Sequence, residues 1–83
     1  MNWQVIFDLF FDIFSIMKFA NVLKDLRTEK ELSQKQLSQK VNISQSTIAR
    51  WELSQTEPTA SALIILADFF NVTIEQLLGL EDL

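Results

Sequence analysis

The sequence lacks several residue types on which chemistry and cross-linking depend. Its 83 residues contain no cysteine and no histidine, and only one glycine and one proline. The missing types exclude disulfides, thiolate nucleophiles and zinc sites, and they remove the commonest general base of enzymes. The single glycine excludes a glycine-rich phosphate loop, and no imidazole is present to activate a hydroxyl. We therefore expect a protein that is not an enzyme and that holds neither a metal nor a cofactor.

The charged residues are unevenly placed along the chain. The formal net charge is −4, which is unusual for a protein that binds nucleic acid. However, all seven basic residues lie between Lys18 and Arg50, and between Lys24 and Arg50 six basic residues accompany three acidic ones. That stretch is mildly basic. Because backbone affinity for DNA comes from cations that displace counterions, the acidic total predicts weak non-specific binding.

Helical patterns dominate the sequence, because the strongest helix breakers occur only at Pro58 and Gly79. Apolar residues at helical spacing predict a first helix over residues 19–30. Two capping boxes, at 33–36 and 73–76, predict helices that begin at Gln34 and Ile74. The predicted fold class is therefore all-α.

Caps and turn residues divide the middle of the chain in the same way. After the second helix, Asn42 suits the left-handed conformation of a tight turn and Ser44 suits an N-cap, which predicts a third helix over residues 45–53. Thr59 caps a fourth helix over residues 60–70, and Gly79 closes the last short helix. Two short helices joined by a tight turn, the second with small polar side chains outside, fit the major groove of DNA.

The residues around this turn resemble one known family. The segment from Leu32 to Glu52 contains a Ser-Gln-x-x-Leu start at 33–37, an Ile at position 48 and a Glu at position 52, and it is followed by Pro58. In this register, residues 19–80 resemble the lambda repressor and Cro family, the XRE-type helix-turn-helix proteins. The resemblance implies a five-helix lambda-repressor-like domain over residues 18–83 that reads the major groove with the helix 45–53.

The resemblance also implies roles for individual residues. The third helix would contact base edges through Gln45, Ser46, Ala49 and Arg50. The second helix would contact the phosphates of the DNA backbone through Gln34, Lys35 and Lys40. Arg27 matches a family arginine that pairs with the glutamate at Glu52, which makes this ion pair structural. Two alternatives stay open: the third-helix side chains form an ordinary solvated face, and Gln34 serves only to start its helix.

Three positions depart from the family pattern. Asn42 stands where the family usually has glycine, and Ser38 replaces the alanine that lets the second and third helices approach. Both residues are tolerable there, since asparagine accepts the left-handed conformation and serine is small. The loop after Glu52 lacks the family's basic residues, so we expect poorer phosphate contacts from it.

Residues 1–17 differ in composition from the rest of the chain. Twelve of these seventeen residues are apolar, and the polar ones recur at helical spacing, at Gln4, Asp8, Asp12 and Ser15. A helix here would have one narrow polar stripe and apolar surface elsewhere, so we expect it to be buried on most sides. The segment is too short and too acidic to span a membrane, and it lacks the basic region of a signal peptide. We expect an additional apolar N-terminal helix that packs or dimerises.

A second apolar surface is predicted on the fourth helix, where Ile65 and Phe69 replace polar or small residues of the family. We expect the N-terminal helix to pack across Ile64, Ile65 and Phe69 and to meet the same helix of a second chain. The predicted dimer or partner interface comprises Trp3, Phe7, Phe10, Phe11, Phe14, Ile65 and Phe69. The alternatives are that the segment only completes the core of one chain, or that the upstream residues are incidental.

These observations predict a cytoplasmic, sequence-specific transcriptional regulator. The preferred form is a homodimeric repressor that occupies a pseudo-palindromic operator of double-stranded DNA, with two recognition helices about 34 Å apart. We expect no effector domain after the last predicted helix, and therefore expect switching to depend on concentration, dimerisation or a partner. One alternative is an antitoxin or protein-interaction module whose N-terminal helix binds a partner protein. Another is that the fold contacts protein and has no DNA function.

Overall fold

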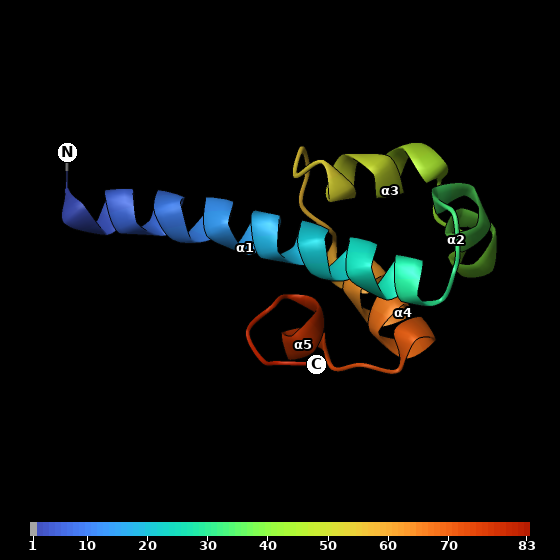
Figure 1. Ribbon diagram of the computed structural model, residues 1–83. Coiled ribbons are helices and arrows are strands. Elements are labelled where there is room, and N and C mark those ends of the chain that lie inside the picture. The colour runs from blue at the N-terminus through green and yellow to red at the C-terminus, as the bar shows by residue number, and fades with distance from the viewer. Residues whose placement is uncertain (1) are drawn as a thin grey trace.

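The computed structural model describes residues 2–83, with the backbone alone for residues 10–13. Within this range the chain forms five helices: α1 (Trp3–Glu29), α2 (Gln34–Val41), α3 (Gln45–Glu52), α4 (Ala60–Phe70) and α5 (Ile74–Leu77). Helices α2 to α5 gather around the C-terminal half of α1, and the N-terminal half of α1 projects from this body (Figure 1). We call residues 3–17 of α1 the extension and residues 18–83 the body.

Each helix begins at a polar side chain that accepts a hydrogen bond from the first turn. The caps are Asn2, Ser33, Ser44, Thr59 and Thr73, and those at Ser33 and Thr73 are full capping boxes. In each box the glutamine three residues later accepts from the backbone N–H of the cap residue. The helix starts predicted at Gln34, Gln45, Ala60 and Ile74 are therefore confirmed, since the caps satisfy N–H groups that the helix cannot pair.

Each helix is followed by a residue in the left-handed conformation. These residues are Glu31, Asn42, Ser54, Asn71 and Gly79, with φ between 55° and 75°. After them the chain returns a backbone N–H to the last helical turn, as from Leu32 to the carbonyl of Arg27. Glycine occupies this position only after α5, where a Cβ on Gly79 would lie 2.9 Å from Cβ of Lys18. The predicted closing roles of Asn42 and Gly79 are confirmed.

The hydrophobic core lies between α1 and the other four helices. Its largest fully buried side chains are Phe19, Leu23, Leu37, Ile48, Leu66 and Leu77. Phe19 packs edge to face against Trp51 of α3, with ring centroids 5.8 Å apart, so the aromatic pair joins α1 to α3. Because all five helices contribute, the core fixes how α3 is held on the body.

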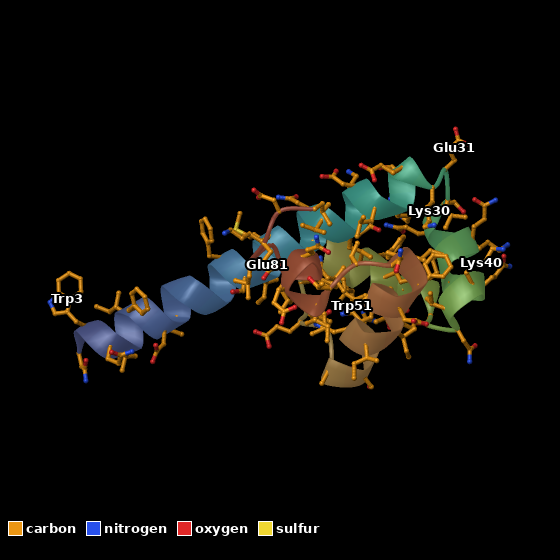
Figure 2. The ribbon with its side chains drawn as sticks, turned by 90° about the horizontal axis from the view of Figure 1, so that it is seen from below. Trp3, Lys30, Glu31, Lys40, Trp51 and Glu81 are labelled. Atoms are coloured by element: carbon orange, nitrogen blue, oxygen red, sulfur yellow. The ribbon has the colours of Figure 1, made fainter. Side chains whose placement is uncertain are left out.

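The predicted N-terminal helix is not a separate element, because it is continuous with the first helix of the body. No glycine or proline occurs between Trp3 and Glu29, so nothing in the sequence interrupts the backbone hydrogen bonds of α1. Figure 2 shows Trp3 at the far end of the extension, away from the body. Among the described residues no helix is both long and apolar enough to cross a membrane.

The predicted packing of the extension against α4 is wrong. Phe69 lies beside the C-terminal end of α1, where Nζ of Lys30 is 5.6 Å from its ring centroid. Trp3 lies 27 positions before Lys30 on the same helix, a separation of about 40 Å at 1.5 Å per residue. Ile64 and Ile65 are exposed, as are most described side chains of the extension, so the extension does not complete the core either. The Phe10 and Phe11 side chains of the predicted interface lie outside the described residues.

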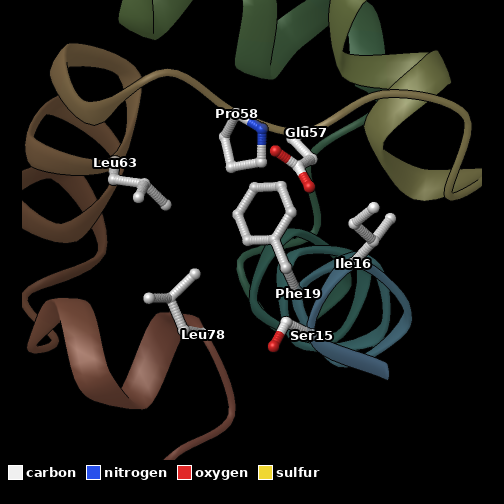
Figure 3. Close-up of a pocket in the computed structure, with 7 residues that line it drawn as sticks. All are labelled: Ser15, Ile16, Phe19, Glu57, Pro58, Leu63 and Leu78. Atoms are coloured by element: carbon white, nitrogen blue, oxygen red, sulfur yellow. The ribbon is translucent and has the colours of Figure 1, made fainter. Parts of the chain in front are cut away.

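A small apolar hollow marks the place where α1 leaves the body. It has a volume of about 190 Å³ and is lined by Ser15, Ile16, Phe19, Glu57, Pro58, Leu63 and Leu78 (Figure 3). This volume is below the range of roughly 300–1,000 Å³ that is usual for small-molecule sites. We therefore regard the hollow as the edge of the core, beyond which the extension has no neighbouring helix of its own chain.

Candidate nucleic-acid interface

The corner between α2 and α3 is built from three residues, 42–44. Asn42 adopts φ 57° and ψ 42°, and its N–H donates to the carbonyl of Ser38 in the last turn of α2. Ser44 then caps α3, because its Oγ accepts from the backbone N–H of Thr47 at 3.2 Å and contacts Oγ1 of Thr47 at 2.7 Å. The left-handed residue turns the chain and the cap starts the next helix, so the angle between the helices is set locally.

The two faces of α3 differ in the way that the sequence predicted. Ile48 and Trp51 are buried against the body, whereas Gln45, Ser46 and Arg50 are exposed. Ala49 is half-buried between them. Since Trp51 contacts Phe19 of α1, the exposed face of α3 points away from α1. The structure therefore brings the four side chains predicted to read bases onto one outer face.

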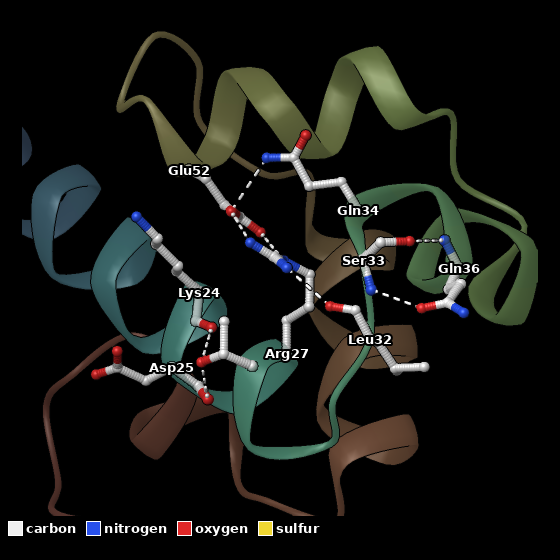
Figure 4. A network of polar contacts seen from close by, with 9 residues as sticks. Lys24, Asp25, Arg27, Leu32, Ser33, Gln34, Gln36 and Glu52 are labelled. Carbon is white, nitrogen blue, oxygen red and sulfur yellow. Dashed lines mark hydrogen bonds and ion pairs between the residues drawn. The ribbon is translucent and has the colours of Figure 1, made fainter.

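An ion pair fastens α3 to α1, as the resemblance implied. Nε of Arg27 donates to Oε2 of Glu52 at 2.7 Å and Nη2 donates to Oε1 at 2.8 Å (Figure 4). The remaining guanidinium nitrogen, Nη1, donates to the carbonyl oxygen of Leu32 at 2.8 Å. The side chains of Arg27 and Glu52 are only 12% and 4% exposed. Two parallel hydrogen bonds between charged groups fix both distance and direction.

The same pairing determines the electrostatics of this junction. The hydrogen bond to Glu52 raises the pKa of Arg27 above its usual value, the Glu52 charge adds to this effect, and burial opposes it. The guanidinium is therefore charged throughout the physiological range. Because Arg27 neutralises Glu52 inside the body, this carboxylate adds little negative charge to the outer face of α3.

Gln34 joins the network instead of projecting freely from α2. Its Nε2 donates to Oε1 of Glu52 at 3.1 Å, so its side chain connects the start of α2 to the end of α3. The sequence did not predict this contact, because 18 positions separate the two residues and no local spacing brings them together. The start of α2 can still meet an anion through the backbone N–H groups of its first turn.

The comparisons with known proteins agree with this geometry. The family described as Helix-turn-helix matches residues 23–77, from the buried half of α1 to the end of α5. The chain belongs to the XRE-type helix-turn-helix family. This family consists of DNA-binding transcription regulators and not of enzymes, in agreement with the prediction from composition. Within the family, α2 and α3 are the helix-turn-helix, and α3 is its recognition helix.

Several curated regulators are similar to this helix-turn-helix chain. The HTH-type transcriptional activator BcrR of Enterococcus faecalis is 39% identical over 81% of this chain and 33% of its own length. The uncharacterized HTH-type transcriptional regulator YobD of Bacillus subtilis (strain 168) is 33% identical over 77% of the chain and 57% of its own. AnsR of the same organism, an HTH-type transcriptional regulator, is 37% identical over 71% and 51%. The chain thus spans about a third to just over half of these relatives, and no solved structure matches it.

The two lysines predicted to contact phosphates lie at opposite ends of the helix that precedes the recognition helix. Lys35 is in the first turn of α2, next to Gln34, and Lys40 is in the last turn. Both side chains are exposed. Five positions along a helix correspond to about 140° around its axis, so the two ammonium groups project from different sides of α2. Lys35 adjoins Gln34 at the start of the helix-turn-helix.

Proposed function

We propose that this chain binds double-stranded DNA sequence-specifically, with its recognition helix α3 in the major groove, and thereby regulates transcription. One observation carries the proposal: Gln45, Ser46 and Arg50 are exposed together on the face of α3 that points away from the body. That face consists of short or flexible polar side chains with one cation, which matches the hydrogen-bonding edges of bases in a groove about 12 Å wide. The family membership supports it.

The proposed contacts follow from the chemistry of each side chain. Gln45 suits two hydrogen bonds to adenine, Arg50 suits guanine or a phosphate, and Ala49 suits the methyl group of thymine. Ser46 accepts or donates to either kind of base. On the DNA backbone we assign the first turn of α2, where Gln34 begins the helix, to one phosphate. We propose that Lys35 and Lys40 also contact the DNA backbone.

Regulation by occupation of an operator requires nothing beyond such binding. An operator that overlaps a promoter would be blocked, so we propose repression, acting in the cytoplasm where the DNA lies. BcrR, which is 39% identical to this chain, is named a transcriptional activator. We further propose that the chain acts as a homodimer on a pseudo-palindromic operator, because two-fold proteins bind two half-sites.

A second candidate function rests on the extension, whose described apolar side chains are largely exposed. In this alternative the chain is an antitoxin or another interaction module, and the extension binds a protein of different sequence. Without that protein, the purified chain would then aggregate or exchange between oligomeric states. A stable symmetric particle of the chain alone would contradict this alternative.

The DNA-binding proposal is tested by selecting bound sites from random duplex DNA and then measuring variants on the selected site. Arg50→Ala should cost about 1–3 kcal/mol, confined to one base position. Lys35→Ala should weaken binding on every sequence and reduce the salt slope by about one unit. Lys24→Ala is the control for the loss of one exposed lysine, since Lys24 lies on α1, outside the helix-turn-helix of α2 and α3.

One result would contradict this proposal and another would revise it. If no sequence is enriched in the selection, the chain does not read DNA. If Arg50→Ala weakens binding equally on all sequences, Arg50 contacts a phosphate and base reading falls to Gln45 and Ser46.

A further inference from the structure

The polar residues of the extension lie on the side of α1 that faces the core farther along the helix. Gln4, Asp8 and Ser15 are followed at the same spacing by Phe19 and Leu26, in steps of 4, 7, 4 and 7 residues. Such steps keep side chains within one sector of a helix of 3.6 residues per turn. Phe19 and Leu26 are buried in the core, whereas Gln4 and Asp8 are exposed and hydrogen-bonded to each other at 2.9 Å. The polar stripe of the extension thus lies in the same sector of α1 as the buried residues Phe19 and Leu26.

The opposite side of α1 shows the reverse pattern. In the body this side carries the exposed polar residues Lys24 and Thr28, and in the extension it carries Trp3, Ile6 and Met17. Trp3 is 84% exposed, the largest exposed fraction among the described apolar side chains of the extension. Figure 2 places Trp3 at the tip of the projecting helix. We call Trp3, Ile6 and Met17 the outer face of the extension. Helices α2 to α5 pack around the C-terminal half of α1, from which the extension projects, so they do not cover the outer face of the extension (Figure 1).

We propose that the outer face pairs with the outer face of a second copy of this chain, with the two extensions antiparallel. The orientation rests on the proposed DNA-binding function. α3 contacts one flank of α1 through Arg27, and the turn that closes α5 contacts the other flank, where Gly79 lies beside Lys18. The outer face, at Met17, is about 80–100° around the helix from each flank. Figure 1 shows α3 and α5 on opposite sides of the α1 axis.

This geometry distinguishes the two ways of pairing. In an antiparallel pair joined through the outer faces, the two-fold axis is perpendicular to α1 and runs along the direction from α1 to α3. That axis carries α3 of one chain to the same side of the pair as α3 of the other, so both recognition faces meet one duplex. In a parallel pair the axis runs along α1, and the recognition faces point in opposite directions. Only the antiparallel pair can place both recognition helices on one straight DNA duplex.

The length of the extension also matches the spacing of half-sites. The antiparallel overlap of Trp3 with the partner's Met17 is centred at their midpoint, position 10. α3 is joined to α1 at Phe19 and Arg27, hence about 13 residues or 20 Å from that centre at 1.5 Å per residue. The two recognition helices are then about 39 Å apart along α1, close to the 34–36 Å that separates successive major-groove faces of DNA. The exposure of the outer face and the length of the extension thus favour the same occupant, a second copy.

Two neighbouring positions provide a matched test of the outer face. Ile6 and Val5 are 43% and 46% exposed, and they point about 100° apart around α1. Ile6→Asp places an unpaired carboxylate in the proposed interface, and should weaken dimerisation about a hundredfold in sedimentation equilibrium without DNA. Val5→Asp should leave the dimer intact. Both variants should keep the helical circular dichroism of the parent, because the two positions lie outside the core. A monomeric parent chain, or equal effects of the two substitutions, would overturn the proposal.

The orientation is tested by disulfide cross-linking, since the chain has no native cysteine. In a mixture of Trp3→Cys and Met17→Cys chains, oxidation should yield the mixed dimer. Trp3→Cys alone should not cross-link to itself. Self-cross-linking of Trp3→Cys would show a parallel pair and overturn the proposal.

Binding of DNA is measured separately, so the two proposals can fail independently. An antiparallel dimer that selects no DNA sequence would contradict the proposed function and keep the pairing. A chain that is monomeric in solution and binds single half-sites would contradict the pairing and keep the function. Ile6→Asp should then bind a two-half-site operator as tightly as the parent does.

Discussion

Replacing Arg27 with methionine should strongly destabilise the domain, because it leaves a buried carboxylate without its cation. Glu52 is 4% exposed and accepts two hydrogen bonds from Arg27, at 2.7 and 2.8 Å. After the substitution only the amide of Gln34, at 3.1 Å, still contacts Glu52. The carbonyl of Leu32 also loses its bond from Nη1. Methionine occupies a similar length of the site but supplies no donor.

The expected loss is about 3–5 kcal/mol, the usual cost of removing one partner of a buried ion pair. A domain of this size has a total stability of roughly 5–15 kcal/mol, so the variant should be close to unfolding. Its Tm should fall by about 12–40 °C, at about 4–8 °C per kcal/mol. The double variant Arg27→Met, Glu52→Leu should recover most of this loss, since it removes both charges and leaves apolar groups of similar volume.

Urea unfolding followed by circular dichroism at 222 nm measures the free energy of unfolding of the parent, of Arg27→Met, of Glu52→Leu and of the double variant. Lys24→Met is the matched control on the same helix; Lys24 is exposed, so its replacement should change stability by less than about 0.5 kcal/mol. A loss below about 1 kcal/mol for Arg27→Met would refute the reasoning, because a pair of that value behaves as a surface ion pair.

The helix ends give three further predictions, all measured as the free energy of unfolding. Ser33→Ala should cost about 1 kcal/mol, because the backbone N–H of Gln36 loses the cap oxygen 3.0 Å away; an unchanged midpoint would contradict this. Asn42→Gly should be neutral or slightly stabilising and Asn42→Val should cost about 1–2 kcal/mol, since φ is 57°; the reverse order would show that the turn does not depend on this angle. Gly79→Ala should be destabilising, because its Cβ would meet Cβ of Lys18 at 2.9 Å; equal stability would require α5 to shift.

Local signals in the sequence predicted the boundaries of most elements. The capping boxes at 33–36 and 73–76 and the caps at Ser44 and Thr59 each act within four residues, so the sequence contains all the information that they need. The third helix was predicted to end at Leu53 and ends at Glu52, where the chain turns toward the left-handed Ser54. The inward and outward sides of α3 were also predictable, because helical periodicity separates Ile48 and Trp51 from Gln45 and Arg50.

The extension could not be placed from composition. Its apolar residues indicated burial, and Ile65 and Phe69 offered a second apolar surface, but two such surfaces in one sequence need not meet. The predicted contact required a sharp bend before Phe19 that the sequence does not encode, since a helix without a kink-forming residue curves only gently. The position of Phe69 beside Lys30, at the other end of α1, could only be seen once α4 was packed.

By itself, the sequence determined what depends on neighbours along the chain: the starts and caps of α2 to α5, the left-handed corner at Asn42, and a polar face on α3 suited to bases. The tertiary structure decided what depends on residues far apart. It brought Arg27 and Gln34 to Glu52 across 25 and 18 positions, and it left the outer face of the extension turned away from its own body. The physical reason is that hydrogen bonds within one helical turn are local, whereas burial depends on which distant surfaces the whole core brings together.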